Sequence, residues 1–518
     1  MKKNYILSII IACSLAVSCN LDYEPVSRYS DITEGVQDGG EFVIFRDRAA
    51  VANQLQTINL RYRGQRELYQ NDYYLFGDTH SDNAYAGTYG QETTPMANNS
   101  VDGSSNNLAR SWPRFYTQIA MANNLIWGVD AVSDLSESEK QQYKAQGKIY
   151  RAMNYLDLVR IWGDVPLVTT VSPDITAENI TELYPLHFPP QADELSVYQL
   201  IEQDLLEALP YAPDDTPATK NRVLQYTVLS KSVARALLVR VYAEKPLRNY
   251  DKVIQYADEL EADGFDLVAN YADLFGVILQ DPTQPPGPDN PAIESRAKHT
   301  VESIYEGAFF PGNTSGSQAR MFGRRLDLWN SEFTWAKWIT PTRDIIREFL
   351  SEEGDKRYEE SVVWYECTWT NHYPMDHYPF MYKYRSTYSS FFKMRYAEIL
   401  LLKAEALIGK GDFAGAAAIL NRIRHRAGLG DLPSSATSSK DAIMKAYLRE
   451  NRLELCFEGQ RWYTLVRLDV VEDAMHGYVA RDEGAEALVY PFGPWSYRLP
   501  IPQTVIDNNS KIVQNPGY

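Results

Sequence analysis

The sequence predicts a mostly α-helical protein, in which tetratricopeptide-like helix pairs form a scaffold with a large irregular, aromatic-rich insertion and long loops. Apolar residues recur at three- and four-residue steps over much of the 518 positions. Two distant segments share the small-residue and turn pattern of a tetratricopeptide helix pair. Between them the period breaks, prolines cluster at 282–291, and five of the ten tryptophans fall between Trp329 and Trp369.

The clearest helix pair runs from Ala404 through Gly411 to Phe413. Small alanines let two antiparallel helices approach closely, Gly411 ends the first helix, and Phe413 packs between the two. A fainter copy begins at Ala234–Tyr242 and continues after Tyr250, so the pairs do not form a regular array. Two ordinary helical hairpins are the alternative interpretation.

The remaining elements follow from the same periodicity. Helices are expected at 42–70, 112–129, 137–162, 194–209, 226–262, 341–350, 395–407, 413–427 and 440–468. These place the scaffold of a single 42–518 domain at about 42–70, 108–262 and 394–470. Residues 71–107 are expected to form a long loop, because glycine, asparagine and serine accumulate there. Residues 263–393 are expected to be irregular, with strand character near 360–365, and both stretches are candidates for ligand binding.

The first eighteen residues predict a secretory signal peptide. Lys2 and Lys3 precede an apolar stretch that is too short to span a bilayer. Leu15–Cys19 is similar to a bacterial lipobox, which would leave Cys19 lipidated and 19–41 as a tether, although the leucine sits one place early. Ordinary secretion with an incidental cysteine is the alternative. Of the later cysteines, Cys367 and Cys456 could pair or stay buried.

The charge balance excludes several classes of partner. The net charge is −17 and the pI is about 5.0. Nucleic-acid binding is disfavoured because phosphate backbones require clustered lysine and arginine. Retention on anionic lipid by basic residues is disfavoured because the chain is acidic. No later stretch reaches membrane-spanning length, so the lipid on Cys19 would be the only membrane anchor.

Four motifs, in this order and spacing, together resemble the SusD/RagB family of outer-membrane nutrient-binding lipoproteins. They are Arg151–Val168, Arg395–Ala406 continuing through Leu420–Gly428, Glu450–Trp462, and Leu499–Gln503 with Gln514–Tyr518. The resemblance implies a cell-surface, lipid-anchored protein that binds oligosaccharides and delivers them to a SusC-like TonB-dependent transporter in the outer membrane. It implies no cofactor and no catalysis. The charged motif residues have helical spacing, which predicts ion pairs between helices, namely Arg151, Arg452, Glu454, Glu458 and Arg461.

Catalytic and metal-binding signatures are missing from the sequence. No nucleophile elbow, phosphate-binding glycine loop or zinc-binding His-Glu-x-x-His helix occurs. His372, Asp376 and His377 are the nearest approach to a metal cluster, but they lie in a proline- and tyrosine-rich segment. These observations favour binding over reaction.

The candidate ligand-binding residues lie in the two variable stretches. Sugars have apolar faces and polar rims, so aromatic rings beside amide, carboxylate and guanidinium groups suit them. The candidates are Asp82, Asn83, Tyr85 and Tyr89 in the first stretch, and Asn313, Arg320, Trp329 and Trp335 in the second. The alternatives are core packing of these rings, a peptide ligand on the same scaffold, or a surface glycan hydrolase.

Overall fold

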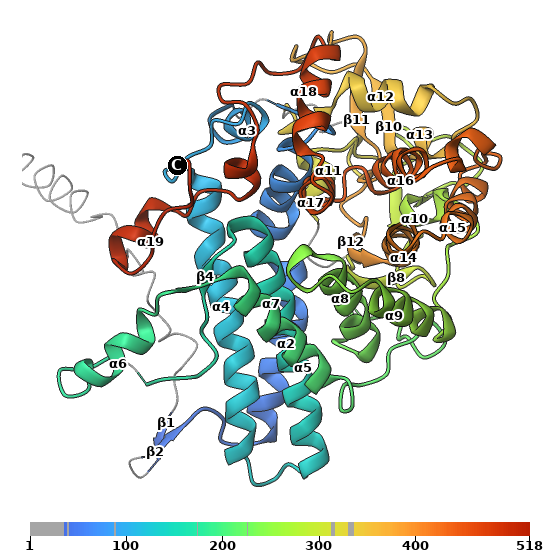
Figure 1. Ribbon diagram of the computed structural model, residues 1–518. Helices are drawn as coiled ribbons and strands as arrows, with labels where there is room; N and C mark the ends of the chain where they lie inside the picture. The colour runs from blue at the N-terminus through green and yellow to red at the C-terminus, as the bar shows by residue number, and fades with distance from the viewer. Residues whose placement is uncertain are drawn as a thin grey trace, which may run out of the picture.

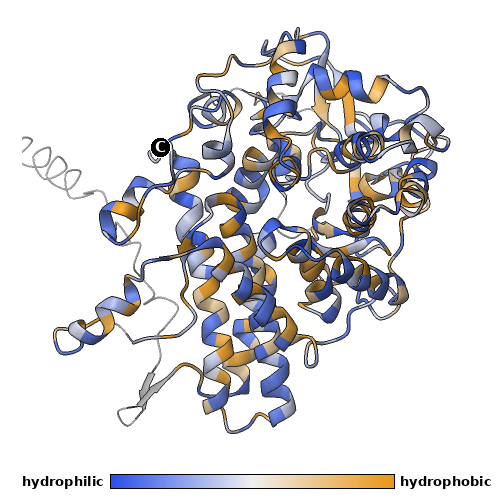
Figure 2. Ribbon diagram, viewed as in Figure 1, coloured by the Kyte–Doolittle hydropathy of each residue, from blue (hydrophilic) through white to orange (hydrophobic). Residues whose placement is uncertain are grey.

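The computed structural model describes residues 36–38, 41–87, 90–173, 175–224, 226–311, 316–329 and 336–518. Helices dominate this part of the chain, as the sequence predicts (Figure 1). The signal peptide, Cys19 and most of the tether lie outside the described residues. Apolar side chains face inward between the elements, so the ribbons alternate between hydrophobic and hydrophilic faces (Figure 2).

Long helices build the N-terminal half. They are α2 (Arg48–Gly64), α4 (Asn106–Gly128), α5 (Glu137–Trp162) and α7 (Glu194–Ala208), with short η3 (Val129–Ala131), α3 (Gly90–Ala97) and α6 (Ile180–His187). α5 packs lengthwise against α4 and α7 (Figure 1). A capping box at Ser136 begins α5, and Gly163, with φ of +76°, ends it. Both ends of α5 were predicted within a residue.

Two helix pairs form the tetratricopeptide-like part, as predicted. The first pair is α8 (Lys231–Ala243) and α9 (Tyr250–Ala262), and the second is α14 (Tyr396–Lys410) and α15 (Phe413–Arg426). α9 packs on α14, so pairs separated by the long insertion lie side by side (Figure 1). A Cβ at Gly409 would lie 2.1 Å from the ring of Tyr250, so this glycine permits the close approach.

The C-terminal elements continue the helical scaffold. They are η6 (Ser434–Thr437), α16 (Lys440–Leu455), α17 (Arg461–Arg467), α18 (Val471–Arg481), η7 (Pro494–Tyr497) and α19 (Gln503–Asn508), whereas the short η4 (Lys245–Leu247) lies between α8 and α9. The last thirty residues are mostly irregular, and they return to α5: Leu499 N–H donates to Ile161 O over 2.7 Å.

The insertion consists of short elements. Its helices are α10 (Ala272–Phe275), α11 (Gln318–Met321), α12 (Arg343–Leu350) and α13 (Lys356–Ser361). Its strands are β6 (Val277–Leu279), β7 (Ala292–Ser295), β8 (Ser303–Gly307), β9 (Ile339–Pro341), β10 (Val362–Tyr365), β11 (Tyr378–Met381) and β12 (Phe391–Arg395). Outside it lie β1 (Val36–Asp38), β2 (Glu41–Val43), β3 (Ala84–Ala86), β4 (Val165–Pro166) and β5 (Gln191–Ala192). Within the described ranges every sheet has two antiparallel strands: β1–β2, β3–β9, β4–β5, β6–β7, β8–β12 and β10–β11.

The long loop expected at 71–107 is wrong for much of its length. π-Helical turns η1 (Leu68–Asp72) and η2 (Leu75–Thr79) precede β3, and α3 and the start of α4 follow. Every side chain of η1 and η2 is buried. A helix that is buried on all sides has no amphipathic period, and this is why the sequence pattern did not reveal it.

Candidate functional site

A buried network of ion pairs joins the insertion to the C-terminal helices. The guanidinium of Arg395 contacts Glu302 at 2.6 Å, Glu454 at 2.6 Å and Glu458 at 2.7 Å. Glu454 also pairs with Arg426, and Lys383 reaches Glu458 at 2.6 Å. Together with the Arg151–Asp204 pair at 2.7 Å, these contacts confirm that the charged motif residues lock helices together.

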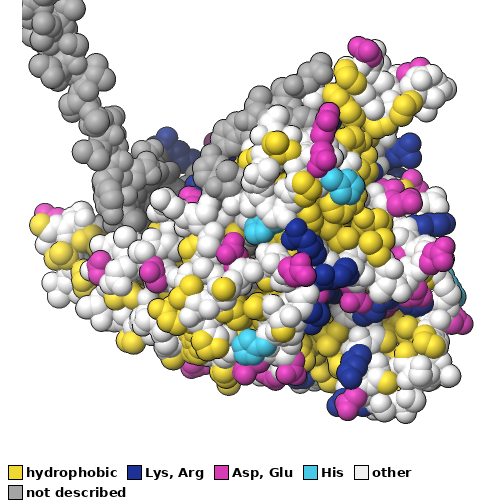
Figure 3. Space-filling model, turned by 90° about the horizontal axis from the view of Figure 1, so that it is seen from above, with side chains coloured by type: hydrophobic (Ala, Val, Ile, Leu, Met, Phe, Trp, Pro, Cys, Tyr) yellow, Lys and Arg dark blue, Asp and Glu magenta, His cyan; other side chains and the backbone are white. Residues whose placement is uncertain are grey.

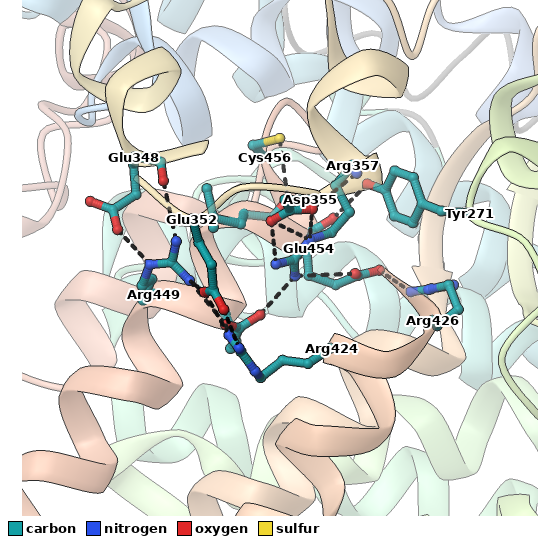
Figure 4. Close-up of polar contacts among 12 residues, drawn as sticks. Tyr271, Glu348, Glu352, Asp355, Arg357, Arg424, Arg426, Arg449, Glu454 and Cys456 are labelled. Atoms are coloured by element: carbon teal, nitrogen blue, oxygen red, sulfur yellow. Dashed lines mark hydrogen bonds and ion pairs between the residues drawn. The ribbon is translucent and has the colours of Figure 1, made fainter. Parts of the chain in front are cut away.

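Figure 4 shows the outer part of the same network. Glu352 is drawn between Arg424 and Arg449, and Glu348 accepts from Arg449 Nε over 2.7 Å. Arg357 lies deeper, where it pairs with Asp355 at 2.7 Å. The charges therefore run from the half-exposed edge of α12 into the interior, and each buried one has an opposite charge beside it.

The network sets the pKa of its carboxyl groups. Burial alone raises the pKa of Glu454, but the guanidinium groups of Arg426, Arg395 and Arg357 outweigh it and lower the pKa to about 2. The pKa of Glu458 is also lowered, because Arg395 and Lys383 overcome its burial. A carboxyl group with a depressed pKa stabilises the fold above its ordinary value of 4.5 and loses that contribution as the pH falls toward 2.

We therefore expect the cost of Glu454→Gln to depend on pH. At pH 6 the substitution should lower the free energy of unfolding by a few kcal/mol, because it removes a paired charge from a buried site. At pH 3 the difference from the wild type should be clearly smaller, because the carboxyl group is largely protonated in the unfolded chain there and must lose that proton on folding. Urea denaturation of both proteins at pH 6, 4.5 and 3 measures this, and a pH-independent difference would contradict it.

Three predicted ligand residues belong to this interior instead of a surface. Asp82 pairs with Arg461 at 2.8 Å and with Arg452 at 3.3 Å, and Asn83 Oδ1 accepts from Arg452 Nε over 3.1 Å. Tyr85 donates its hydroxyl hydrogen to the carboxylate of Asp482. These three predicted side chains are at most 1% exposed, so they support the neighbouring surface and do not form it.

The two variable stretches meet at one junction. β3, which carries Tyr85, pairs with β9, and Gly87 N–H donates to Trp338 O over 2.6 Å. Trp338 N–H in turn donates to Met321 O over 2.9 Å, at the end of α11. The 71–107 stretch and the insertion, which are more than 200 positions apart in the sequence, are therefore hydrogen-bonded to each other beside α11.

A cluster of aromatic rings and arginines lies on the same insertion, next to α11. We call Arg324, Trp329, Tyr365, Tyr382 and Arg385 the aromatic–arginine cluster. The guanidinium carbon of Arg324 lies 4.0 Å from the ring centroid of Trp329 and 4.7 Å from that of Tyr365. The Trp329 and Tyr365 rings meet edge-on, with centroids 5.7 Å apart and an interplanar angle of 87°. The guanidinium carbon of Arg385 lies 3.7 Å above the ring of Tyr382.

Two buried arginines hold the rings of the cluster in place. Arg324 and Arg385 are only 1% and 5% exposed, whereas the three rings are half-buried. Arg385 Nε donates to Tyr382 O over 2.7 Å, and its guanidinium pairs with Glu360 at 2.8 Å. Stacked guanidinium groups restrain the rings by cation–π attraction. The result is a rigid, partly exposed set of rings, which suits a flat apolar ligand face.

The other predicted site residues lie in different parts of the chain's structure or outside the described residues. Trp329 is part of the cluster, and Arg320 is exposed on α11. Tyr89, Asn313 and Trp335 lie outside the described residues. Sequence reasoning missed Tyr365 and Tyr382 as surface residues, because nothing local distinguishes these tyrosines from core ones. The strand predicted near 360–365 was the available signal, since it places Tyr365 at the end of β10.

The remaining candidates take part in packing. His372 stacks on Tyr85 with centroids 4.4 Å apart, and His377 stacks on Trp364 at 4.1 Å. Among the described side chains, no three His, Cys, Asp or Glu residues converge as a metal site would require. Cys367 and Cys456 are both free thiols. On the face seen in Figure 3, hydrophobic side chains gather beside histidine and a row of lysine and arginine.

Comparisons with known proteins decide the family. A family described as "SusD family" matches residues 378–518, and one described as "Starch-binding associating with outer membrane" matches residues 42–243. The chain belongs to the SusD/RagB family. Among curated members, SusD-like protein P2 of Formosa agariphila is 27% identical over 81% of this chain and 83% of its own. SusD-like protein P38 of the same organism is 25% identical over 91% and 93%.

Solved SusD structures share the fold. A laminarin binding SusD-like protein superposes with a TM-score of 0.67 and 23% identity, over 92% of this chain and all of its own. Surface glycan-binding protein A of Bacteroides fluxus gives 0.70 and 19% identity over the same shares. The SusD/RagB family comprises non-catalytic glycan-binding proteins associated with the outer membrane. No helix in the described ranges has both the length and the hydropathy needed to cross a bilayer.

Proposed function

We propose that this SusD/RagB protein is a lipid-anchored cell-surface receptor for oligosaccharides. It binds them on the aromatic–arginine cluster and delivers them to a SusC-like, TonB-dependent outer-membrane transporter. The observation that carries the proposal is the arrangement of Trp329, Tyr365 and Arg324, in which two half-exposed rings are fixed by one buried guanidinium. Relatives named for binding laminarin and surface glycans support this choice of ligand.

The cluster suits a saccharide that must be released again. A ring that covers about 40 Å² of a sugar contributes on the order of 1 kcal/mol at roughly 25 cal/mol/Å². Binding in the millimolar to micromolar range requires a net binding free energy of about −4 to −8 kcal/mol. The contacts must also offset several kcal/mol for the translational and rotational freedom that the ligand loses. A few rings with hydrogen bonds from neighbouring polar groups therefore give modest affinity, as delivery to a transporter requires.

Charges beside the cluster are paired within the protein. Asp327 contacts Arg325 at 3.0 Å and accepts from Thr387 Oγ1 over 2.7 Å, and Arg385 pairs with Glu360. A charged peptide would have to break such pairs, whereas the hydroxyl groups of a neutral sugar can add hydrogen bonds to them. This favours a neutral glycan over the peptide ligand.

Lipidation at Cys19 is part of the proposal. The lipobox-like Leu15–Cys19 supports it, and the tether to residue 41 would leave the folded domain outside the membrane.

A ligand panel tests the proposal. The mature chain without Cys19 should bind at least one of starch, laminarin, xylan, mannan and pectin in affinity electrophoresis. Isothermal titration with the matching oligosaccharide should then give a micromolar to millimolar Kd. A library of peptides of varied charge serves as the comparison. Binding of peptides without any glycan would refute the proposal and support the peptide-binding alternative.

A further inference from the structure

A groove lies at the opposite end of the molecule from the insertion. It has a volume of about 370 Å³ and runs between the first turns of α5, the 210–214 loop after α7, and Lys231 at the start of α8. Figure 1 places this end of α5 far from β10 and α11, which lie above its other end. The volume falls within the range of small-molecule sites, roughly 300–1,000 Å³.

An exposed ring projects from a fixed loop into this groove. Tyr211 is 51% exposed, although backbone hydrogen bonds hold the loop that carries it. Its N–H donates to Ala208 O over 3.0 Å, and Lys231 N–H donates to Pro213 O over 3.0 Å. Pro210 and Pro213 flank the ring and fix their own φ angles. A loop held in this way loses little further freedom when a ligand binds.

The polar groups of the groove are mixed and balanced in charge. Ser138 and Gln142 present an exposed hydroxyl and amide one helical turn apart on α5. Lys231 and Asp214 form an ion pair at 3.0 Å, and the carboxylate of Glu139 is held by Arg48. No charge of the groove is left uncompensated by these pairs, so a neutral polyhydroxyl ligand fits it better than an anion or a cation.

From these features we infer that the Tyr211 groove is a second carbohydrate-binding site, distinct from the aromatic–arginine cluster. A sugar ring stacks on Tyr211, and its hydroxyls bond to Ser138, Gln142, Asp214 and Lys231. The inference rests on the proposed function, because it takes the ligand class from it. It adds a second point of attachment on the scaffold, where the sequence predicted no site.

The separation of the two sites determines how they act. α5 alone has 26 residues, equivalent to about 39 Å. A short oligosaccharide cannot reach from the groove to the cluster, whereas one polysaccharide chain can occupy both. Joining two weak sites through one ligand raises the overall affinity by up to about 10²–10⁴-fold. The groove therefore retains long chains at the cell surface while the cluster binds a segment for delivery.

The test uses Tyr211→Ala, Tyr211→Phe, Trp329→Ala and the Tyr211→Ala/Trp329→Ala double variant. The probes are laminarihexaose and laminarin, or the equivalent pair for whichever panel polysaccharide the wild type binds. Tyr211→Ala should weaken retention by the polysaccharide at least tenfold in affinity electrophoresis, and Tyr211→Phe should stay near the wild type. With the hexasaccharide, the double variant should bind clearly more weakly than Trp329→Ala alone, because it loses the groove and keeps only the weakened cluster.

Two outcomes would overturn the inference. One is unchanged polysaccharide retention by Tyr211→Ala; the other is hexasaccharide binding that is equally strong in Trp329→Ala and in the double variant. In both cases the wild type still binds glycan, so the proposed function stands. A wild type that binds no glycan refutes the proposed function itself. Unchanged melting temperatures show that the variants are folded, and Tyr490→Ala, which removes a ring that is 55% exposed elsewhere, controls for loss of any exposed tyrosine.

Discussion

Arg395→Met should destabilise the protein by about 3–5 kcal/mol, because it leaves Glu302, Glu454 and Glu458 without their shared buried counter-charge. Burial alone would lower the pKa of Arg395, but these carboxylates hold it well above its usual value, so the guanidinium stays charged. Methionine fills a similar volume, so the loss reports the uncompensated carboxylates more than a cavity. Urea denaturation at pH 7 measures the change.

A matched arginine on the surface provides the control. Arg422 pairs with Glu261 at 2.8 Å and Asp266 at 2.6 Å, but its side chain is 36% exposed. Because water and salt screen exposed pairs, Arg422→Met should cost no more than about 1 kcal/mol. Equal losses for the two variants would contradict a structural role of the buried network.

Trp329→Ala and Tyr365→Ala should each weaken binding of the panel oligosaccharide. Each substitution removes one ring from the aromatic–arginine cluster, and Trp329→Ala also removes the π-face over which Arg324 lies. A loss of about 1–2 kcal/mol for each ring corresponds to a Kd that is roughly 5- to 30-fold higher. Isothermal titration measures the change, and circular dichroism checks that the fold is unchanged.

Trp127→Ala is the matched control for this prediction. Trp127 is also an exposed tryptophan, at 49%, but it lies on α4 with its indole N–H bonded to Thr169 O at 2.8 Å. Its removal should leave the Kd within twofold of the wild type. An equal loss in Trp127→Ala would show that the effect is not specific to the cluster.

Local patterns predicted the scaffold well. The bounds of α5, the turn at Gly411 and the two helix pairs follow from periodicity, capping and small residues, all of which act within a few positions. The interhelical ion pairs were also predicted, because charged residues at three- and four-residue steps in apolar segments need buried partners.

The candidate surface could be predicted only in part, for a physical reason. Trp329 was proposed from the aromatic-rich composition of its segment, but the cluster also depends on Arg324, which joins Trp329 to Tyr365, a ring about forty positions away in the sequence. Asp82 and Tyr85 have side chains that suit a sugar, yet they are paired with Arg461 and Asp482, nearly 400 positions away. Such long-range partners decide whether a polar or aromatic residue faces ligand or core, and no local period encodes them.

The most direct test of glycan capture at the cluster is a titration of the panel oligosaccharide into the wild type and into the Trp329→Ala/Tyr365→Ala double variant. The saccharide is recovered afterwards and weighed by mass spectrometry. We predict saturable binding to the wild type, at least a 25-fold loss in the double variant by adding about 1–2 kcal/mol for each ring, and a saccharide of unchanged mass. Wild-type affinity in the double variant, or a shortened saccharide, would contradict the account.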